Sequence, residues 1–390
     1  MLRFRLLGCL LAMATVAPVP AFAAHPSESA SRETIALREA WRAGADDDDL
    51  FFGDIQQVIA DADGNLLLVD KQRCCIEVFA VDGTHLRTLS REGEGPGEVR
   101  GPYGACVLPD GGIAMPQRFA GKVVVIEPDG SPREVWDLFE HYYTVNTVMS
   151  GGGGLLVAGQ YNEPLSDGQV QHFVLAGHDL DGRRRCVYVE KTNTLNYHPL
   201  NLDEAGSYCA RQRRCAIGPD GRVYAATSRN EYRIEVFRPD GSADGVVTRA
   251  FEPWSRTAAE RDRNRAILED DVRNIDLPKE FTVEANEPAI DYLHVDAAGR
   301  LWVQHGRSWR GRDPGVLVVF DVFDPTGRLE REVELRGPGD LADDLVWILD
   351  DGRFVLVVGG VGGQRAVDEE FDDGEPVQVV MLETESSLRP

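Results

Sequence analysis

The chain has 390 residues, of which 43% are hydrophobic and 27% are charged, and its formal net charge is −24. This balance excludes a disordered or membrane-embedded chain, and the negative charge argues against binding a nucleic-acid backbone through the general surface. The 40 glycines are spread along the sequence, which excludes collagen-like and low-complexity chains.

Residues 1–23 are predicted to be a secretory signal peptide. Arg3 and Arg5 precede an apolar stretch from Leu6 to about Val19, and Ala21-Phe-Ala supplies the small-x-small pattern of a cleavage site. This stretch is too short for a transmembrane helix, and no later one is suitable. We therefore expect residues 24–390 to be exported to the periplasm or secreted. Lipid anchoring through the cysteine at position 9 is the less favoured alternative.

The mature chain would keep six of the seven cysteines. An even number in an exported protein permits disulfides. Cys209 and Cys215 are close enough in sequence to close a small loop, and Cys186 is a competing partner. Spacing alone does not choose among the pairings that six cysteines allow.

A short pattern recurs six times: an apolar strand, a turn of the Asp-Gly type and a second apolar strand. The copies lie at 58–70, 105–115, 145–157, 215–225, 293–303 and 346–356. Two apolar runs separated by Asp-Gly predict a β-hairpin. A second hairpin follows most copies, at 76–89, 123–130, 173–182, 234–241 and 318–327. The sequence therefore predicts an all-β, six-bladed β-propeller of four-stranded antiparallel blades.

Two further elements are expected outside these hairpins. A strand at 34–41 precedes the first copy, whereas the last unit stops after its third strand at 377–383. We expect the N-terminal strand to become the outer strand of the last blade and to close the ring. A short helical insertion between blades four and five is expected at 254–274, which lacks Gly and Pro and begins with a Ser255 cap. This helix is interpreted either as a lid over the channel or as a solvated shield.

The repeats resemble NHL-type six-bladed propellers, the TolB-like group of exported bacterial proteins. The similarity covers about residues 34–385 and implies a fold more than an activity, because propellers host unrelated functions. The segments that carry it are Arg91–Glu98, Pro102–Gly111, Gly299–Val303 and Phe320–Asp324.

The candidate site lies at the mouth of the predicted channel, because the long irregular segments fall on the face opposite the Asp-Gly turns. These segments are 160–169, 190–213, 251–287, 305–315 and 359–375. Arginine suits anionic groups, and Trp suits stacking on a ring or a cation. The candidate ligand-binding residues are Tyr103, Arg118, Tyr161, His305, Arg307, Trp309, Arg310 and Arg365. Acidic residues at 368–373 share this face, so a surface network of ion pairs is the alternative.

No catalytic motif and no set of metal ligands is recognised. The mouth-proximal ends of the first strands are predicted to hold Gln56, Tyr103, Val145, Arg213, Asp291 and Asp344. This set makes a poor cage for a divalent cation, which prefers oxygen ligands. The aspartates at 46–49 could attract Ca²⁺, although most such runs are solvated loops.

We therefore expect an exported, monomeric, noncatalytic binding or scaffold protein. Its mouth would recognise a protein partner or a small ligand, and anions are the favoured small ligands. No nucleic acid and no cofactor are expected, with Ca²⁺ as the exception named above. The alternative is a metal-dependent enzyme similar to propeller lactonases and lyases, acting at the mouth of the channel.

Overall fold

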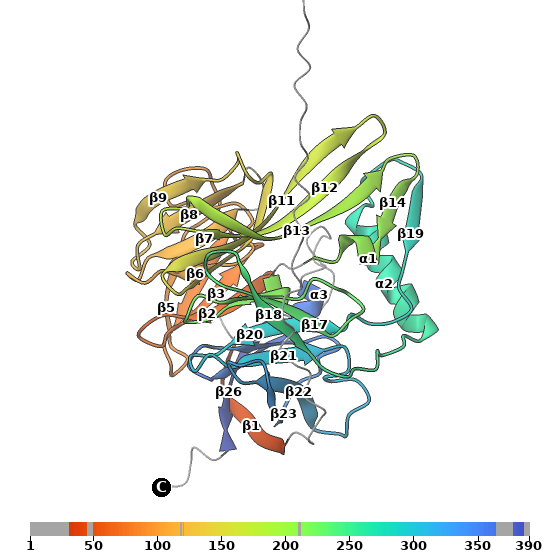
Figure 1. Ribbon diagram of the computed structural model, residues 1–390. Helices are drawn as coiled ribbons and strands as arrows, with labels where there is room; N and C mark the ends of the chain where they lie inside the picture. The colour runs from red at the N-terminus through yellow and green to blue at the C-terminus, as the bar shows by residue number, and fades with distance from the viewer. Residues whose placement is uncertain are drawn as a thin grey trace, which may run out of the picture.

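The computed structural model describes residues 31–44, 50–117, 119, 121–209, 212–363 and 377–385. Four four-stranded sheets and one eight-stranded sheet are arranged as in a propeller (Figure 1). The predicted signal peptide at 1–23 and the aspartates at 46–49 lie outside the described residues. No helix among those residues is both long and apolar enough to cross a membrane.

Each four-stranded sheet is antiparallel and keeps its strands in chain order. The first contains β2 (Ile55–Ala60), β3 (Leu66–Asp70), β4 (Cys75–Phe79) and β5 (His85–Leu89). The second contains β6 (Cys106–Val107), β7 (Ile113–Gln117), β8 (Lys122–Ile126) and β9 (Pro132–Asp137). The third contains β10 (Thr144–Gly151), β11 (Gly154–Leu165), β12 (Gly168–His178) and β13 (Arg184–Asn196). The fourth contains β15 (Cys215–Ile217), β16 (Val223–Ala225), β17 (Arg233–Phe237) and β18 (Ala243–Thr248).

The Asp-Gly turns form for a reason that is visible in the first hairpin. The Asp61 carboxylate accepts hydrogen bonds from the backbone N–H groups of Asp63 (3.0 Å) and Asn65 (2.8 Å). Gly64 follows with φ at 80°, a left-handed conformation that glycine adopts without steric cost. The repeated motif thus specifies the turn locally, and the apolar runs on either side are left to pair.

The eight-stranded sheet corrects the prediction for the last two units. Its order is β20 (Ile290–Val295), β21 (Leu301–His305), β22 (Val316–Phe323), β23 (Leu329–Arg336), β1 (Ser31–Ala43), β26 (Gln378–Thr384), β25 (Phe354–Val358) and β24 (Leu345–Ile348). The first half of β1 pairs in parallel with β23, and its second half pairs antiparallel with β26. The expected pairing of the N-terminal strand with the last unit is present. However, β1 has 13 residues, long enough to join both units into one sheet.

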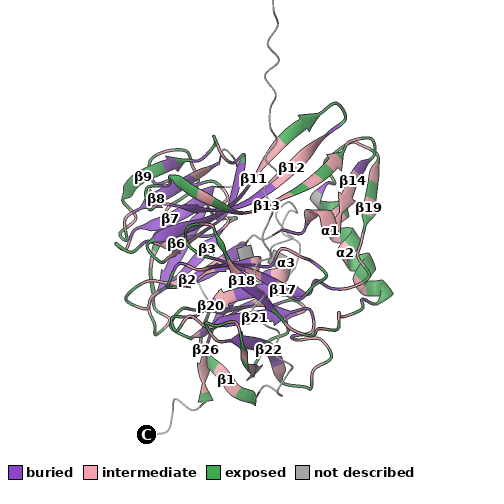
Figure 2. Ribbon diagram, viewed as in Figure 1, coloured by how far each residue is buried: buried purple, intermediate pink, exposed green. Residues whose placement is uncertain are grey.

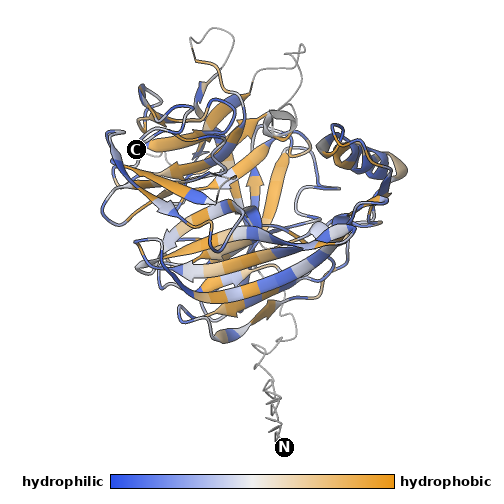
Figure 3. Ribbon diagram, turned by 90° about the horizontal axis from the view of Figure 1, so that it is seen from above, coloured by the Kyte–Doolittle hydropathy of each residue, from blue (hydrophilic) through white to orange (hydrophobic). Residues whose placement is uncertain are grey.

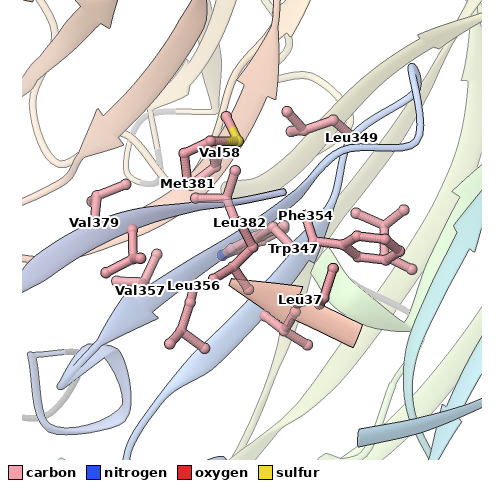
Figure 4. Close-up of a cluster of buried hydrophobic side chains, with 14 of the residues drawn as sticks. Leu37, Val58, Trp347, Leu349, Phe354, Leu356, Val357, Val379, Met381 and Leu382 are labelled. Atoms are coloured by element: carbon pink, nitrogen blue, oxygen red, sulfur yellow. The ribbon is translucent and has the colours of Figure 1, made fainter. Parts of the chain in front are cut away.

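The cluster of buried apolar side chains around β1 shows how this sheet is held (Figure 4). Leu37 of β1 is 4% exposed and packs in the same cluster as Leu356 of β25 and Leu382 of β26. Val58 of β2 belongs to it as well, so the cluster extends to the neighbouring first sheet. Figure 2 shows the distribution of burial over the whole molecule: the strands inside are buried, whereas the strand tips and α2 carry exposed residues. Burial of these side chains is the main stabilising contribution.

The third sheet is longer than the sequence indicates. Its strands β11 and β12 stay paired as far as Leu165 and Gly168, and together with β13 they project beyond the other sheets (Figure 1). The segment 160–169, expected to be an irregular loop, is therefore mostly strand. Along β13, partly buried side chains alternate with exposed ones, which is the period of a strand with one solvated face.

The remaining elements lie in insertions. β14 (Leu200–Asp203) pairs in parallel with β19 (Lys279–Thr282), and short turns form α1 (Glu204–Ser207), η1 (Gln212–Arg214) and α3 (Gly360–Gly363). The predicted helix is α2 (Ala258–Asp271), whose residues are largely hydrophilic (Figure 3). Its cap is Thr257 instead of Ser255, because Thr257 and Glu260 form a reciprocal capping box.

Candidate functional site

A cavity of about 190 Å³ occupies the centre of the sheet arrangement. Its walls come from the first strand of every predicted unit, namely β2, β6, β10, β15, β20 and β24, together with the residues next to them. Gln56, Tyr103 and Arg213 line it at the mouth, as expected from strand counting. The cavity is thus a product of the whole ring.

Arg213 is the middle residue of η1, two positions before the start of β15. Its guanidinium lies 4.2 Å from the ring centroid of Tyr292 and 4.8 Å from that of Trp347. One nitrogen, Nη2, donates a hydrogen bond to the carbonyl of Val346 (3.2 Å). The other, Nη1, is buried and has no hydrogen-bond partner among the described residues. Burial lowers the pKa of Arg213, which is the mark of a cation held away from water.

Two more nitrogens of the cavity wall share this property. Nε1 of Trp347 and Nε2 of His294 are buried and have no hydrogen-bond partner within the described part of the chain. The His294 ring lies nearly parallel to that of Tyr292, with 6.4 Å between centroids. Burial lowers the pKa of His294 to about 4, so the imidazole is neutral at pH 7. Arg213, His294 and Trp347 therefore each bring to the surroundings of Tyr292 one buried nitrogen that has no hydrogen-bond partner among the described residues.

Only two charged side chains are found among the described residues that line the cavity, Arg213 and Asp350. Asp350 follows β24 at the end opposite the mouth and is exposed at the rim of the cavity. The surrounding walls still remove enough water to raise the pKa of its carboxyl, and the charge of Asp351 adds to this effect. Neither Arg213 nor Asp350 forms an ion pair with another described residue.

The predicted loop at 305–315 follows β21 and carries the candidate residues Arg307, Trp309 and Arg310 at the mouth. Arg310 lies over the Trp309 ring at 4.1 Å and forms an ion pair with Glu287 (2.9 Å). Arg307 lies 5.4 Å from the Trp254 ring, and 4.0 Å separates its guanidinium from the Glu252 carboxylate. The two arginines thus already have partners within the protein.

His305 begins this loop and is buried. Its Nδ1 accepts a hydrogen bond from the backbone N–H of Arg307 (3.1 Å), and its Nε2 lies 3.7 Å from the Asp321 carboxylate. Burial lowers the pKa of His305 to about 4, against the weaker opposing effect of Asp321. The ring packs against Phe251 and Tyr232, so it is a packed side chain of the mouth.

Arg310 belongs to a buried charge cluster that we call the mouth network, made of Glu204, Arg229, Arg256, Glu287 and Arg310. Arg256 donates two hydrogen bonds to the Glu204 carboxylate (2.7 and 2.8 Å) and one to Glu287 (2.9 Å). Arg229 also pairs with Glu204. Sequence reasoning missed this network, because its members lie far apart along the chain and only the fold brings them together.

The other predicted site residues lie apart. Tyr103 lines the cavity, and Lys71 lies 5.0 Å from its ring centroid. Tyr161 is on the projecting part of β11, where it stacks on His172 at 4.2 Å and donates a hydrogen bond to Glu190 (2.7 Å). The positions of Arg118 and Arg365 lie outside the described residues.

The structure holds the six described cysteines in the reduced form. Cys209 and Cys215, the expected disulfide pair, are both buried. Burial raises the pKa of Cys215 to about 12, and the charge on Cys209 contributes to the shift. A disulfide between them stays a prediction for the oxidised protein.

The residues present do not fit a divalent cation. Within the described ranges, no group of three or more His, Cys, Asp or Glu side chains is placed to hold a metal ion. Asp291 and Asp344, two of the acids predicted at the mouth-proximal ends of first strands, are not among the residues that line the cavity. Asp344 instead accepts hydrogen bonds from the backbone N–H groups of Asp340 (2.7 Å) and Gly359 (2.9 Å). We therefore derive no metal-dependent step.

No family model matches the chain, and no curated protein matches it. Among solved structures, it is similar to a Bacteroides fragilis protein that is thought to be exported. That match has a TM-score of 0.50 and 14% identity, and covers 90% of this chain and 100% of the other. A gluconolactonase from Xanthomonas campestris matches with a TM-score of 0.44 and 12% identity, over 85% of this chain and 87% of the other. A streptogramin B lyase matches with a TM-score of 0.42 and 10% identity, over 84% and 78%.

These likenesses concern the fold alone. The arrangement of small antiparallel sheets is itself propeller-like. The narrower assignment to NHL or TolB-like propellers stays a prediction.

Proposed function

We propose that this chain is an exported, noncatalytic binding protein whose central cavity takes a small anionic ligand at Arg213. The observation that carries the proposal is the buried Nη1 of Arg213, which has no hydrogen-bond partner among the described residues. A buried donor without an acceptor costs free energy. The charge of Asp291 acts on Arg213, but the two form no ion pair, so an anion entering from the mouth would supply the missing acceptor and a counter-charge in direct contact.

The surroundings of Arg213 favour this role. Tyr292 and Trp347 hold the guanidinium through their ring faces, a contact worth roughly 2 kcal/mol when it is desolvated. Such contacts keep the cation in place without neutralising it, so its charge stays available to a ligand. Trp347 Nε1 and His294 Nε2 lie in the same wall and could contribute further hydrogen bonds.

The mouth supports the proposal in a different way. Among the sequence candidates, Tyr103 lines the cavity itself, so we place it at the entrance beside Arg213. The mouth network has three arginines and two glutamates, and Glu260 lies 4.0 Å from Arg310, so its charges balance and the proposed anion site is Arg213 alone.

We also propose that the fold is a six-bladed propeller. On this interpretation the eight-stranded sheet is two blades that share β1. What supports it is that β20 and β24 both line the cavity, as the first strands of the four separate sheets do.

The binding function is tested by calorimetric titration of the mature protein with caproate, a carboxylate with a short apolar chain. We expect saturable binding that weakens tenfold to a hundredfold in Arg213→Gln, because a charge-assisted hydrogen bond is worth roughly 1.5–3 kcal/mol. The matched control is Arg263→Gln on α2, whose guanidinium is half exposed and lies 3.1 Å from Asp343.

Arg307→Gln separates the cavity from the mouth. Unchanged affinity in this variant supports Arg213 as the anion site, whereas a loss as large as that of Arg213→Gln would move the site to the mouth. Failure of the wild-type protein to bind caproate and sulfate would overturn the proposal.

A further inference from the structure

We propose that the ligand is an elongated zwitterion, with its anionic end on Arg213 and an ammonium group on Asp350. This inference rests on the proposed function, since it takes Arg213 as the anion site and adds a second recognition point. The chemical class is that of ω-amino acids, in which an apolar chain separates a carboxylate from an amine.

The first observation is a difference among the hairpin turns. Five turns between the first and second strands are closed by the same two backbone hydrogen bonds. The N–H of one residue donates to the carbonyl four residues later, and its own carbonyl accepts from the N–H three residues later. This residue is Asp61, Leu108, Gly218, Asp296 or Leu349. In the first four, the next residue has no charge, being Ala62, Pro109, Pro219 or Ala297. In the last it is Asp350. The turn therefore forms without an acid at this position, and the aspartate needs another explanation.

The second observation is the contrast between Asp350 and its neighbour. Asp351 forms an ion pair with Arg353 (2.6 Å) and accepts a hydrogen bond from its backbone N–H (3.1 Å). Asp350 has no such partner in the described part of the chain, although it lines the cavity. The structural acid of the turn is thus Asp351, and Asp350 is available to a ligand.

The separation of the two charges sets the length of the ligand. Arg213 bonds to the carbonyl of Val346, and Asp350 is four residues farther along the same segment. Because β24 ends at Ile348 and Asp350 lies in the turn that follows, this segment spans at most roughly 13 Å, the length of four fully extended residues. An α-amino acid carries both charges on one carbon and is too short to reach both ends, whereas a linear chain with charged termini can.

The wall between the two charges suits a hydrocarbon chain. Val58, Met149 and Leu293 line the cavity, together with the ring of Trp347. Each methylene removed from water against such a wall strengthens binding through the hydrophobic effect. Apolar walls with one cation and one anion at opposite ends thus match a zwitterion more closely than a simple carboxylate.

The test compares four probes by calorimetric titration at pH 7: ε-aminocaproate, caproate, hexylamine and γ-aminobutyrate. For the wild-type protein we expect ε-aminocaproate to bind roughly tenfold more tightly than caproate, because a second charge-assisted bond forms. Hexylamine, which lacks the anionic end, and γ-aminobutyrate, which is too short, should both bind more weakly than ε-aminocaproate.

Asp350→Asn should remove the advantage of ε-aminocaproate and leave the affinity for caproate unchanged. The matched control is Asp351→Asn in the same turn, which should keep the advantage, and thermal unfolding checks that both variants are folded. Equal binding of the two probes to the wild-type protein, or an advantage that survives Asp350→Asn, would overturn this inference and leave the anion site standing. If neither carboxylate binds, the proposed function itself fails.

Discussion

Arg213 in the cavity and Arg256 in the mouth network are the same residue type in two different states. Arg256 is 5% exposed and its guanidinium donates to two glutamates, Glu204 and Glu287. Arg213 has aromatic rings on its faces and one carbonyl as acceptor, and its Nη1 has no partner in the described ranges. Strand counting in the sequence predicted the place of Arg213, whereas only the fold reveals the place of Arg256.

The difference separates structural from binding arginines. A buried cation with carboxylate partners joins the segments that carry them, here α1 and the insertion around α2. A buried cation without a carboxylate contributes little to stability and is suited to an external anion. Four variants or conditions test this difference between the two arginines and their surroundings, and they follow in order of their expected effect on stability.

Arg256→Met should cause the largest loss, about 3 kcal/mol or more in the free energy of unfolding. Removing the cation takes three hydrogen bonds from Glu204 and Glu287 and leaves each partly buried carboxylate with a single arginine, Arg229 or Arg310, and breaking a buried ion pair costs more than the pair contributes. Denaturant unfolding measures the loss, and caproate titration of the folded variant should show wild-type affinity. A loss below 1 kcal/mol would mean that the network is not structural.

Acidification should reveal the buried histidines of both regions. The pKa values of His305 and His294 are lowered by burial from 6.5 to about 4. As the pH is lowered, these histidines therefore bind protons in the unfolded chain before they do so in the folded one. Their contribution to the free energy of unfolding is fully present above pH 6.5, falls as the pH drops and levels off below about 4. Denaturant unfolding at pH 7 and pH 4.5 should show a loss from His305 of roughly 2–3 kcal/mol.

The variant that checks this is His305→Gln, which cannot be protonated. Between pH 7 and pH 4.5, the unfolding free energy of this variant should fall less than that of the wild-type protein, by roughly 2–3 kcal/mol. An identical pH profile would show that His305 has the same pKa in the folded and unfolded states, against the expected effect of burial.

Arg213→Met should change stability little, from no loss to a gain of about 1 kcal/mol. The variant gives up the contacts with Tyr292 and Trp347 but also removes an unpaired desolvated charge, and these effects oppose each other. Thermal and denaturant unfolding measure the outcome. A loss of more than 2 kcal/mol would place Arg213 among the structural arginines and weaken the comparison.

Arg263→Ala should have the smallest effect, less than about 0.5 kcal/mol. Its ion pair with Asp343 links α2 to the segment before β24, but the two side chains are 50% and 69% exposed, and exposed pairs contribute little. Denaturant unfolding in low and high salt would detect any larger contribution. Such a contribution would show that α2 is held more firmly than its exposed surface indicates.

Much of the fold could be predicted from the sequence, because the decisive information is local. The Asp-Gly turns specify their own conformation, and the apolar runs beside them pair with their nearest neighbours. The helix α2 was also predictable from a long segment without Gly or Pro. By contrast, the parallel pairing of Leu200–Asp203 with Lys279–Thr282 depends on two insertions meeting in space, and no local pattern indicates it.

The candidate site was harder to predict for a related reason. Strand counting placed Arg213 at the mouth-proximal end of a first strand, yet its Nη1 without a partner among the described residues became visible only with every strand in place. Asp350 was not predicted to be a site residue, because an Asp-Asp-Gly turn resembles the Asp-Gly turns of the other repeats. Comparing the same turn position across the repeats, Ala62 and Pro109 against Asp350, is the signal that could have found it.

The position of β1 has a consequence for how the chain matures. Leu37 pairs with Thr384, and Ser31 pairs with Arg331, so the strand made first by the ribosome waits for partners that are made last. Pairings between such distant residues slow folding, since a long loop must close before they form. Until synthesis is complete, β1 and the edges of β23 and β26 can pair with other chains. Chaperone protection of the growing polypeptide is therefore expected to matter most at this stage.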